Sequence, residues 1–289
     1  MRIAVLGMGR MGHAVAGRLL DGGHEVTIWN RTAGRAGDLV ARGAREADSV
    51  AAASVGAEVV ITCLADDPAV AATALGDGGV RQSIGDGAVY ADSSTISPAL
   101  SRRLDQEFPR FAAMPILGSP AAVAGGDAGY LVGGTPEVAA LLDPVLGSLA
   151  AVVHRFDKPT QASTAKLALN LLLLDGIVAV AESVTVCRSA GLTDDQVRGL
   201  LGPSSLVAPG LKNRFEGILT GTLDPWWTAS LGAKDAGLAV DAVVAADGEL
   251  PLTACARQRY LDAAASGLGD EDIVAVAALY RSAGGLTTR

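Results

Sequence analysis

The chain has 289 residues, of which 49% are hydrophobic and 19% are charged. A chain of this length and composition can bury more than one core, and two domains suit it better than one. The formal net charge of −8 argues against nucleic acid or an anionic membrane as a partner, because binding to phosphates needs an excess of cations. The three cysteines lie far apart without a CxxC pair, so the sequence predicts neither a disulfide framework nor a metal site.

The start of the chain and its most apolar segment predict where the protein resides. Met1-Arg2 leads directly into an apolar strand, without a charged segment followed by a long apolar one. The longest apolar run, 167–181, is interrupted by Asn170, Asp175 and Gly176, so we expect a buried helix there and no bilayer span. We therefore predict a cytoplasmic protein with reduced cysteines.

The first half of the chain alternates apolar runs with helical patterns. Buried strands are predicted at 3–6, 25–29, 59–63 and 89–92, and weaker ones at 112–114, 130–132 and 152–154. Helices are predicted at 14–20, 33–42, after Pro68, at 98–107 and at 136–149. Repeated strand–helix units predict an α/β Rossmann domain with a parallel-rich sheet over residues 1–160.

The pattern changes after about Lys158. Helical periodicity alone follows, over 163–190, 194–201, 211–219, 226–246, 251–265 and 270–283. We therefore predict an all-α domain over residues 161–289, which begins with a long interdomain helix and serves substrate binding and dimerisation.

Gly7-Met8-Gly9-Arg10-Met11-Gly12 follows the first predicted strand and precedes a helix. In this position a G-x-G-x-x-G pattern predicts a dinucleotide-binding turn. The first glycine permits the tight turn, the second lets the backbone approach a pyrophosphate, and the third lets helix and strand pack closely. The helix N-terminus then offers N–H groups and the positive end of its dipole to the phosphates.

The residues after the second strand predict which dinucleotide binds. A carboxylate there would bind the ribose 2′-hydroxyl of NAD, but the sequence has Asn30-Arg31-Thr32, with Arg35 one turn further on. Arg31 can pair with the 2′-phosphate of NADP, and Asn30 and Thr32 can add neutral donors. The sequence therefore predicts NADP(H), with a merely solvated Arg31 as the alternative.

Hydride transfer to or from a carbonyl needs a group that moves a proton at the oxygen. None of the three histidines lies in the predicted second domain or beside an obvious acidic partner, and we expect packing or surface roles for them. Lys166 and Asn170 lie four residues apart, on one face of an apolar helix. A buried lysine can release a proton near neutral pH and an arginine cannot, so Lys166 is a candidate acid/base and Asn170 a candidate orienting group. A lysine snorkelling from a helix end is the alternative.

Three other segments supply further candidates. Lys234 could bind a substrate carboxylate or assist Lys166, or it could form only a surface ion pair. The hydroxyls of 92–98 follow a strand end, where they could contact the nicotinamide or substrate, or cap the next helix. Gly118-Ser119 and the glycine-rich 125–129 could offer N–H groups to a carboxylate, or form plain loops.

The order of these motifs along the chain resembles that of the β-hydroxyacid dehydrogenase family, which includes 3-hydroxyisobutyrate dehydrogenases, tartronate semialdehyde reductases and glyoxylate/succinic semialdehyde reductases. The resemblance covers nearly the whole chain, at 7–12, 92–98, 114–119, 166–170 and Lys234-Asp235. It implies Lys166 as the catalytic acid/base, Asn170 and Lys234 as its supporting polar groups, and Thr95 beside the nicotinamide. It also implies a homodimer or homotetramer built around the long helix.

The sequence thus predicts an NADP(H)-dependent dehydrogenase or reductase that transfers hydride between nicotinamide and a small β-hydroxyacid, semialdehyde or 2-oxoacid. The predicted catalytic residues are Lys166 and Asn170, and the predicted substrate-binding residues are Thr95, Gly118, Ser119 and Lys234. The predicted cofactor-binding residues are Gly7, Met8, Gly9, Arg10, Met11, Gly12, Asn30, Arg31, Thr32, Arg35, Cys63, Leu64, Thr95 and Lys234.

Two departures from the family pattern leave the substrate open. Residues 160–163 (Thr-Gln-Ala-Ser) stand where the family usually has a glycine-rich approach to the lysine, and Leu117-Gly118-Ser119 stands in place of a Ser-Gly-Gly substrate loop. One alternative is an imine reductase, which shares the architecture but typically carries another residue at the position of Lys166. Another is a non-catalytic NADP-binding protein, against which the lysine and the acidic charge argue.

Overall fold

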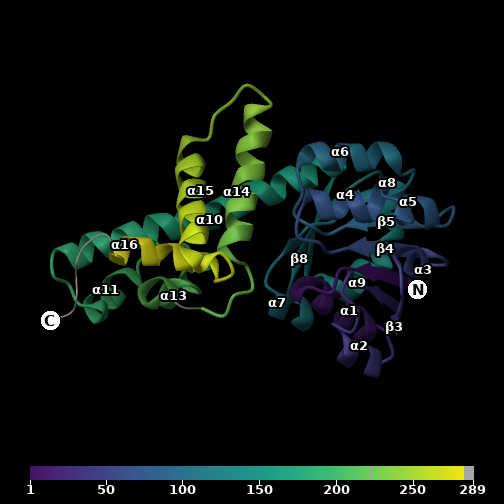
Figure 1. The fold of residues 1–289 in the computed structure, drawn as a ribbon, viewed down its shortest axis with the longest axis horizontal. Helices are drawn as coiled ribbons and strands as arrows, with labels where there is room; N and C mark the ends of the chain where they lie inside the picture. Colours follow the sequence, from purple (N-terminus) through teal and green to yellow (C-terminus); the bar gives the residue numbers. More distant parts are fainter. Residues whose placement is uncertain (222, 283–289) are drawn as a thin grey trace. The chain divides into compact units, whose positions relative to one another are not determined.

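The structure is a computed structural model that describes residues 1–221 and 223–282 (Figure 1). By its internal contacts the chain divides into two compact units, Met1–Lys166 and Leu167–Arg289. The first unit is α/β and the second is helical.

One mixed sheet forms the centre of the first unit, in the order β3-β2-β1-β4-β5-β6-β8-β7, with β9 paired to β8. The strands from β3 to β6 are parallel, whereas β8 runs antiparallel to β6 and β7 and parallel to β9. The order reverses between β1 and β4, which is where such sheets bind dinucleotides. The strands are β1 (Arg2–Leu6), β2 (Glu25–Trp29), β3 (Arg45–Glu46), β4 (Val59–Thr62), β5 (Val89–Asp92), β6 (Phe111–Ala113), β7 (Ile116–Leu117), β8 (Gly129–Gly133) and β9 (Val152–Phe156).

Helices cover both faces of this sheet, because alternate strand residues bury apolar side chains on opposite sides. Ile3 and Val5 of β1 join one cluster with α1, α2, α7, α8 and α9, and Ala4 and Leu6 join another with α3 to α6. These helices are α1 (Arg10–Asp21), α2 (Gly37–Ala41), α3 (Val50–Ser54), α4 (Asp67–Leu75), α5 (Val80–Ser83), α6 (Pro98–Glu107), α7 (Pro120–Gly125), α8 (Pro136–Leu141) and α9 (Asp143–Leu149).

The helical unit packs around the long helix α10 (Pro159–Ser189), whose Leu174, Ile177 and Val184 lie in its core. Tyr260 is fully buried there and donates its hydroxyl to the Leu174 carbonyl at 2.9 Å. The other helices are α11 (Asp194–Leu201), α12 (Pro209–Lys212), α13 (Phe215–Thr220), α14 (Ala229–Val244), α15 (Pro251–Ala263), the π-helical η1 (Ala264–Leu268), the 3-10 helix η2 (Ile273–Ala277) and α16 (Ala278–Ser282).

Among the described residues, α10 alone is long and apolar enough to span a membrane by length and composition. Core helices of soluble proteins pass the same test, and α10 carries a row of buried residues that belongs to the helical core. This agrees with the predicted buried helix.

The predicted fold class is confirmed, and the differences lie in the short elements. The strands β3 and β7 and the helices α3, α5 and α7 were not expected. The helix predicted at 136–149 is two helices, because Pro144 lies at the start of α9. The helix predicted at 226–246 begins only at Ala229, where Thr228 caps α14. Residue 283 of the helix predicted at 270–283 lies outside the described residues.

Candidate functional site

The turn between β1 and α1 contains three glycines with different structural roles, Gly7, Gly9 and Gly12. Gly7 has a φ of +104°, and a Cβ on it would lie 2.4 Å from the Cys63 carbonyl oxygen. A Cβ on Gly12 would lie 1.9 Å from the Gly7 carbonyl oxygen, so neither position admits a side chain. Gly9 caps α1, and a Cβ on it would meet no described atom within 4 Å. Open space at a helix N-terminus fits a pyrophosphate.

Asn30 joins this turn to the end of β2. Its Oδ1 accepts the Met8 N–H at 2.9 Å, and its Nδ2 donates to the Thr32 carbonyl at 2.8 Å. The side-chain amide of Asn30 therefore fixes the backbone conformation of both loops through two hydrogen bonds.

The residues predicted to bind the 2′-phosphate of NADP lie on the loop between β2 and α2. Arg31, Thr32 and Arg35 are exposed. The Gly34 N–H donates to Glu46 Oε1 at 2.8 Å, which fastens this loop to β3. Two guanidinium groups at the carboxyl end of β2 suit an anion on the adenosine ribose.

Cys63 and Leu64 follow β4, beside the residues that follow β5. The Leu64 N–H donates to Ser94 Oγ at 2.9 Å, and Thr95 is half-buried in the next position. Cys63 supports the glycine turn with its carbonyl, and burial raises the pKa of its thiol. This burial favours the neutral thiol of Cys63.

Asp92, at the end of β5, is a buried carboxyl group in the same place. Its Oδ1 accepts the Thr62 hydroxyl at 2.6 Å and the Ser94 hydroxyl at 2.8 Å. Burial raises the pKa of Asp92 to about 7, against the lowering effect of these two donors. The sequence placed Asp92 only within the segment 92–98, because nothing in the spacing shows that the hydroxyls of Thr62 and Ser94 meet on it.

Gly118 and Ser119, predicted to bind substrate, connect β7 to α7. Gly118 has a φ of +144°, a backbone conformation that glycine readily adopts. Ser119 caps α7, where its Oγ accepts the Ala122 N–H at 3.2 Å. Pro120 at the first helical position supports the same helix start.

In the helical unit, a buried polar group lies between α10 and α14. Asn170 Nδ2 donates to Asp235 Oδ2 at 2.9 Å, and Lys234 Nζ pairs with Asp235 Oδ1 at 2.6 Å. Asn170 and Asp235 are both buried, and Lys234 is 22% exposed. Lys166 precedes Asn170 by one turn of α10 and is half-buried. The sequence analysis named Asp235 only within the Lys234-Asp235 motif and gave it no role in the site.

Trp226 and Trp227 precede α14 with ring centroids 6.2 Å apart. The Arg214 guanidinium lies over the Trp226 ring at 4.6 Å, and Arg214 also pairs with the buried Asp272 at 3.5 Å. Trp227 packs against the helical core.

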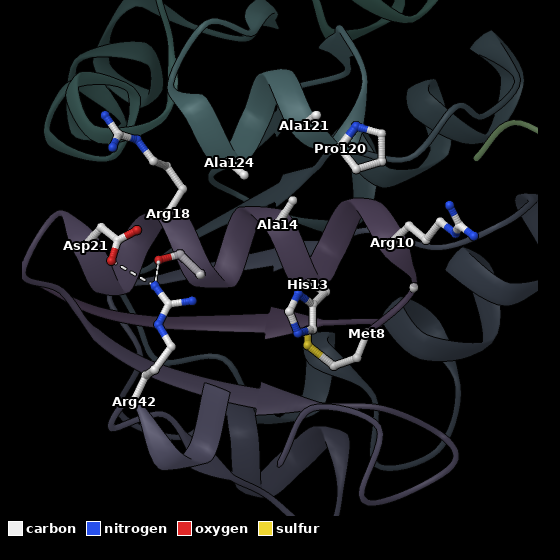
Figure 2. Close-up of a pocket in the computed structure, with 12 residues that line it drawn as sticks. Met8, Arg10, His13, Ala14, Arg18, Asp21, Arg42, Pro120, Ala121 and Ala124 are labelled. Carbon is white, nitrogen blue, oxygen red and sulfur yellow. Dashed lines mark hydrogen bonds and ion pairs between the residues drawn. The ribbon is translucent and has the colours of Figure 1, made fainter. Parts of the chain in front are cut away.

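A cavity of about 620 Å³ runs along α1. Figure 2 shows α7 on one side of it, and Arg42 reaching Asp21 from the other. Small residues of α1 and α7 leave room for this cavity, and Arg10, Arg18 and Arg42 are among its lining residues. The cavity includes Gly9 and Arg10 of the turn but none of the predicted substrate residues. His13, on its border, pairs with Asp38 at 2.9 Å.

Across residues 1–221 and 223–282, no group of three His, Cys, Asp or Glu side chains could hold a metal ion. The described polar groups instead fit an organic cofactor at the glycine turn. The Rossmann unit carries this turn, and α10 and α14 carry Lys166, Asn170 and the Lys234–Asp235 pair. These features define the class of nicotinamide-dependent oxidoreductases.

Comparisons with known proteins narrow this class. Residues 2–157 match the model of the NAD-binding domain of 6-phosphogluconate dehydrogenase, and residues 160–280 match the model of the NAD-binding domain of NADP-dependent 3-hydroxyisobutyrate dehydrogenase. The chain belongs to the β-hydroxyacid dehydrogenase family.

Two relatives and one solved structure match over nearly their full length. The chain is 31% identical over 283 residues to an oxidoreductase of Bacillus subtilis, covering 96% of this chain and 98% of the relative. It is 28% identical to 3-sulfolactaldehyde reductase of Escherichia coli, covering 99% and 98%. A crystal structure of 3-hydroxyisobutyrate dehydrogenase from Salmonella typhimurium superposes with a TM-score of 0.86 at 25% identity, covering 96% of this chain and 99% of that one.

Proposed function

We propose that this protein is an NADP(H)-dependent oxidoreductase that transfers hydride between the nicotinamide and a small β-hydroxyacid or the corresponding semialdehyde or 2-oxoacid. The observation that carries the proposal is the buried contact between Asn170 and Asp235, with Lys234 on the same carboxylate. Together with Lys166 one turn earlier on α10, these residues provide a proton-transferring amine and a fixed polar support.

The cofactor would supply the hydride, and the chain's own residues would handle the proton and the polar groups of the substrate. In the reducing direction, the Lys166 ammonium gives one proton to the carbonyl oxygen as the carbon receives the hydride. In the oxidising direction, the neutral amine takes the hydroxyl proton. Asn170, whose Nδ2 is held by Asp235, can orient the substrate through its remaining amide positions. Thr95, Gly118, Ser119 and Lys234 are the proposed substrate contacts.

NADP(H) is proposed over NAD(H) on the charge of the loop after β2. Arg31 and Arg35 are exposed at the position of the adenosine ribose, and the side chain of Asn30 stands where an NAD-binding protein has a carboxylate. A 2′-phosphate would gain charge-assisted hydrogen bonds there.

The relatives support an anionic carbonyl substrate. Among them are 3-sulfolactaldehyde reductase of Escherichia coli and glyoxylate/succinic semialdehyde reductase 1 of Arabidopsis thaliana, which is 26% identical over 280 residues. Both names describe a carbonyl compound that also bears an anionic group.

We further propose a homodimer or homotetramer in the cytoplasm. Leu169, Leu172 and Val186 of α10 are 44%, 74% and 69% exposed, and a second copy would cover them. Light scattering on the purified protein would measure the mass directly, and a monomer at micromolar concentration would contradict this assignment.

The test of the proposed activity is a screen of NADPH oxidation against short semialdehydes, 2-oxoacids and cyclic imines. We expect turnover with an anionic semialdehyde or 2-oxoacid. Lys166→Ala and Lys166→Arg should both abolish it while NADPH still binds. Near-normal turnover by Lys166→Arg would remove the proton-transfer role, and turnover confined to cyclic imines would replace the proposed substrate class.

A further inference from the structure

The carboxyl ends of β4 and β5 lie side by side, with Thr62 opposite Asp92 in the strand register. The adenosine half of a dinucleotide lies over β1 and β2, so its nicotinamide half lies over β4 and β5, on the other side of the point where strand order reverses. The loops that follow these two strands therefore face the reactive ring. This placement rests on the proposed function.

A continuous series of hydrogen bonds connects the two loops through Asp92. The Thr62 hydroxyl donates to Asp92 Oδ1, so the Tyr90 hydroxyl, 3.0 Å from Thr62 Oγ1, must donate to Thr62. The Ser94 hydroxyl also donates to Asp92 Oδ1 and accepts the Leu64 N–H at 2.9 Å. One oxygen of Asp92 thus fixes the rotamer of a serine that holds the backbone of the neighbouring loop.

The same two loops are joined a second time nearer the surface. Asp67, at the start of α4, accepts the Ser97 N–H at 2.9 Å and the Ser97 hydroxyl at 2.5 Å. Thr95 lies in the two-residue interval between Ser94 and Ser97. Its backbone is therefore held on both sides, by Asp92 through Ser94 and by Asp67 through Ser97.

The other carboxyl oxygen of Asp92, Oδ2, lacks such contacts among the described residues. Asp92 is 1% exposed, and its Oδ2 has no hydrogen-bond partner among the described residues. A buried carboxylate with an unpaired oxygen is costly, whereas the protonated acid is not charged. A fold that needed only a hydrogen-bond acceptor at this place could use an asparagine, so an ionisable group here calls for a chemical reason.

We propose that Asp92 is a positioning residue of the proposed hydride-transfer site, which holds Leu64 and Thr95 against the nicotinamide and changes its charge with the oxidation state of that ring. The oxidised nicotinamide carries a positive charge and the reduced ring does not. A nearby carboxylate is therefore stabilised by the oxidised cofactor, and the neutral acid is compatible with the reduced one.

The groups that face Asp92 allow this change near neutral pH. Burial raises its pKa to about 7, and Asp67 adds to the increase. The other titratable neighbours are Cys63 and Tyr90, and burial raises the pKa of each, so both remain neutral. Asp92 is thus the member of this cluster that changes charge between pH 6 and 8.

The experiment compares Asp92→Asn, Asp92→Ala and Ser94→Ala with Ser101→Ala as the matched control. Ser101 is a fully buried serine of α6 whose hydroxyl has no described hydrogen-bond partner, so its variant removes the same atom without touching the loops. We expect Asp92→Ala and Ser94→Ala to lower kcat at least tenfold with KM for NADPH changed less than threefold. Ser101→Ala should keep both parameters within twofold.

The second measurement is the Kd of the wild type and of Asp92→Asn for NADP⁺ and for NADPH from pH 6 to 8. In the wild type, the ratio of the Kd for NADP⁺ to the Kd for NADPH should fall at least threefold as the pH rises from 6 to 8. In Asp92→Asn, which keeps a hydrogen-bond acceptor but cannot ionise, this ratio should be constant. An equal pH dependence in Asp92→Asn, or unchanged kcat in Asp92→Ala, would overturn the proposal. Absence of cofactor binding by the wild type would instead overturn the proposed function.

Discussion

Asn170 donates a hydrogen bond to Asp235 across 65 positions of sequence, and the contact is buried between α10 and α14. Because Asp235 also pairs with Lys234, one carboxylate fixes the amide and the ammonium at once. The predicted site residues Asn170 and Lys234 are therefore connected through Asp235, to which the sequence analysis assigned no role.

Asp235→Asn should lower kcat/KM about 10- to 100-fold, since a hydrogen bond to a charged group contributes roughly 1.5–3 kcal/mol. The amide keeps the volume of the side chain but removes the charge that holds Lys234. Asp241→Asn, at an exposed position of the same helix, is the control and should leave kcat/KM unchanged. Equal values for the two variants would show that Asp235 does not support the site.

Gly9→Ala and Gly12→Ala should separate cofactor binding from folding. Gly9 has a φ of −72° and open space around it, so Gly9→Ala should keep the wild-type Tm and lose at least tenfold in NADPH affinity. In Gly12→Ala the new Cβ meets the Gly7 carbonyl, which should lower the free energy of unfolding by at least about 2 kcal/mol. Normal NADPH affinity in Gly9→Ala would mean that no phosphate group approaches this turn.

Arg31→Ala should weaken NADPH about 10- to 100-fold, because it removes a charge-assisted bond to the 2′-phosphate. NADH, which lacks that phosphate, should lose less than twofold. Arg102→Ala, an exposed arginine of α6, controls for the general loss of positive charge. Isothermal titration of the wild type and both variants with NADPH and NADH measures these affinities, and equal losses for NADPH and NADH would place Arg31 away from the phosphate.

The elements that sequence could predict are those whose local pattern decides their structure. The glycine turn and β1 are adjacent in the chain, and Lys166 and Asn170 share one helix, so spacing alone relates them. Asp92 and Asp235 depend on contacts between separate elements, and no local period marks them. The two-residue strands β3 and β7 were missed for a similar reason, since a strand of that length has no alternation to detect.

The buried acid at Asp92 should make stability fall as pH rises toward neutrality. The folded protein holds this proton up to a pKa of about 7, whereas the unfolded chain releases it near the ordinary carboxyl pKa of 3.8. Between these values the unfolded state binds fewer protons, so the free energy of unfolding falls by about 1.4 kcal/mol per pH unit and levels off above pH 7. Asp92→Asn should lack this contribution. Urea unfolding of both proteins at pH 5, 6, 7 and 8 measures it, and parallel pH curves would contradict it.

The ion pair between Arg214 and Asp272 is buried, with side chains that are only 7% and 0% exposed. Removing one charge leaves the other buried without a counter-charge, which costs roughly 3–5 kcal/mol. Asp272→Asn and Arg214→Met should each show a loss of this size in urea unfolding, which the fluorescence of Trp226 can follow because Arg214 stacks on its ring.

The double variant Arg214→Met/Asp272→Asn removes both charges and should lose much less than the sum of the single losses. Glu216→Gln breaks an exposed ion pair with Arg198, in which the Glu216 side chain is 61% exposed, and should change stability by less than about 0.5 kcal/mol. Additive losses in the double variant would mean that the two residues act separately and that Arg214 is held by Trp226 and not by Asp272.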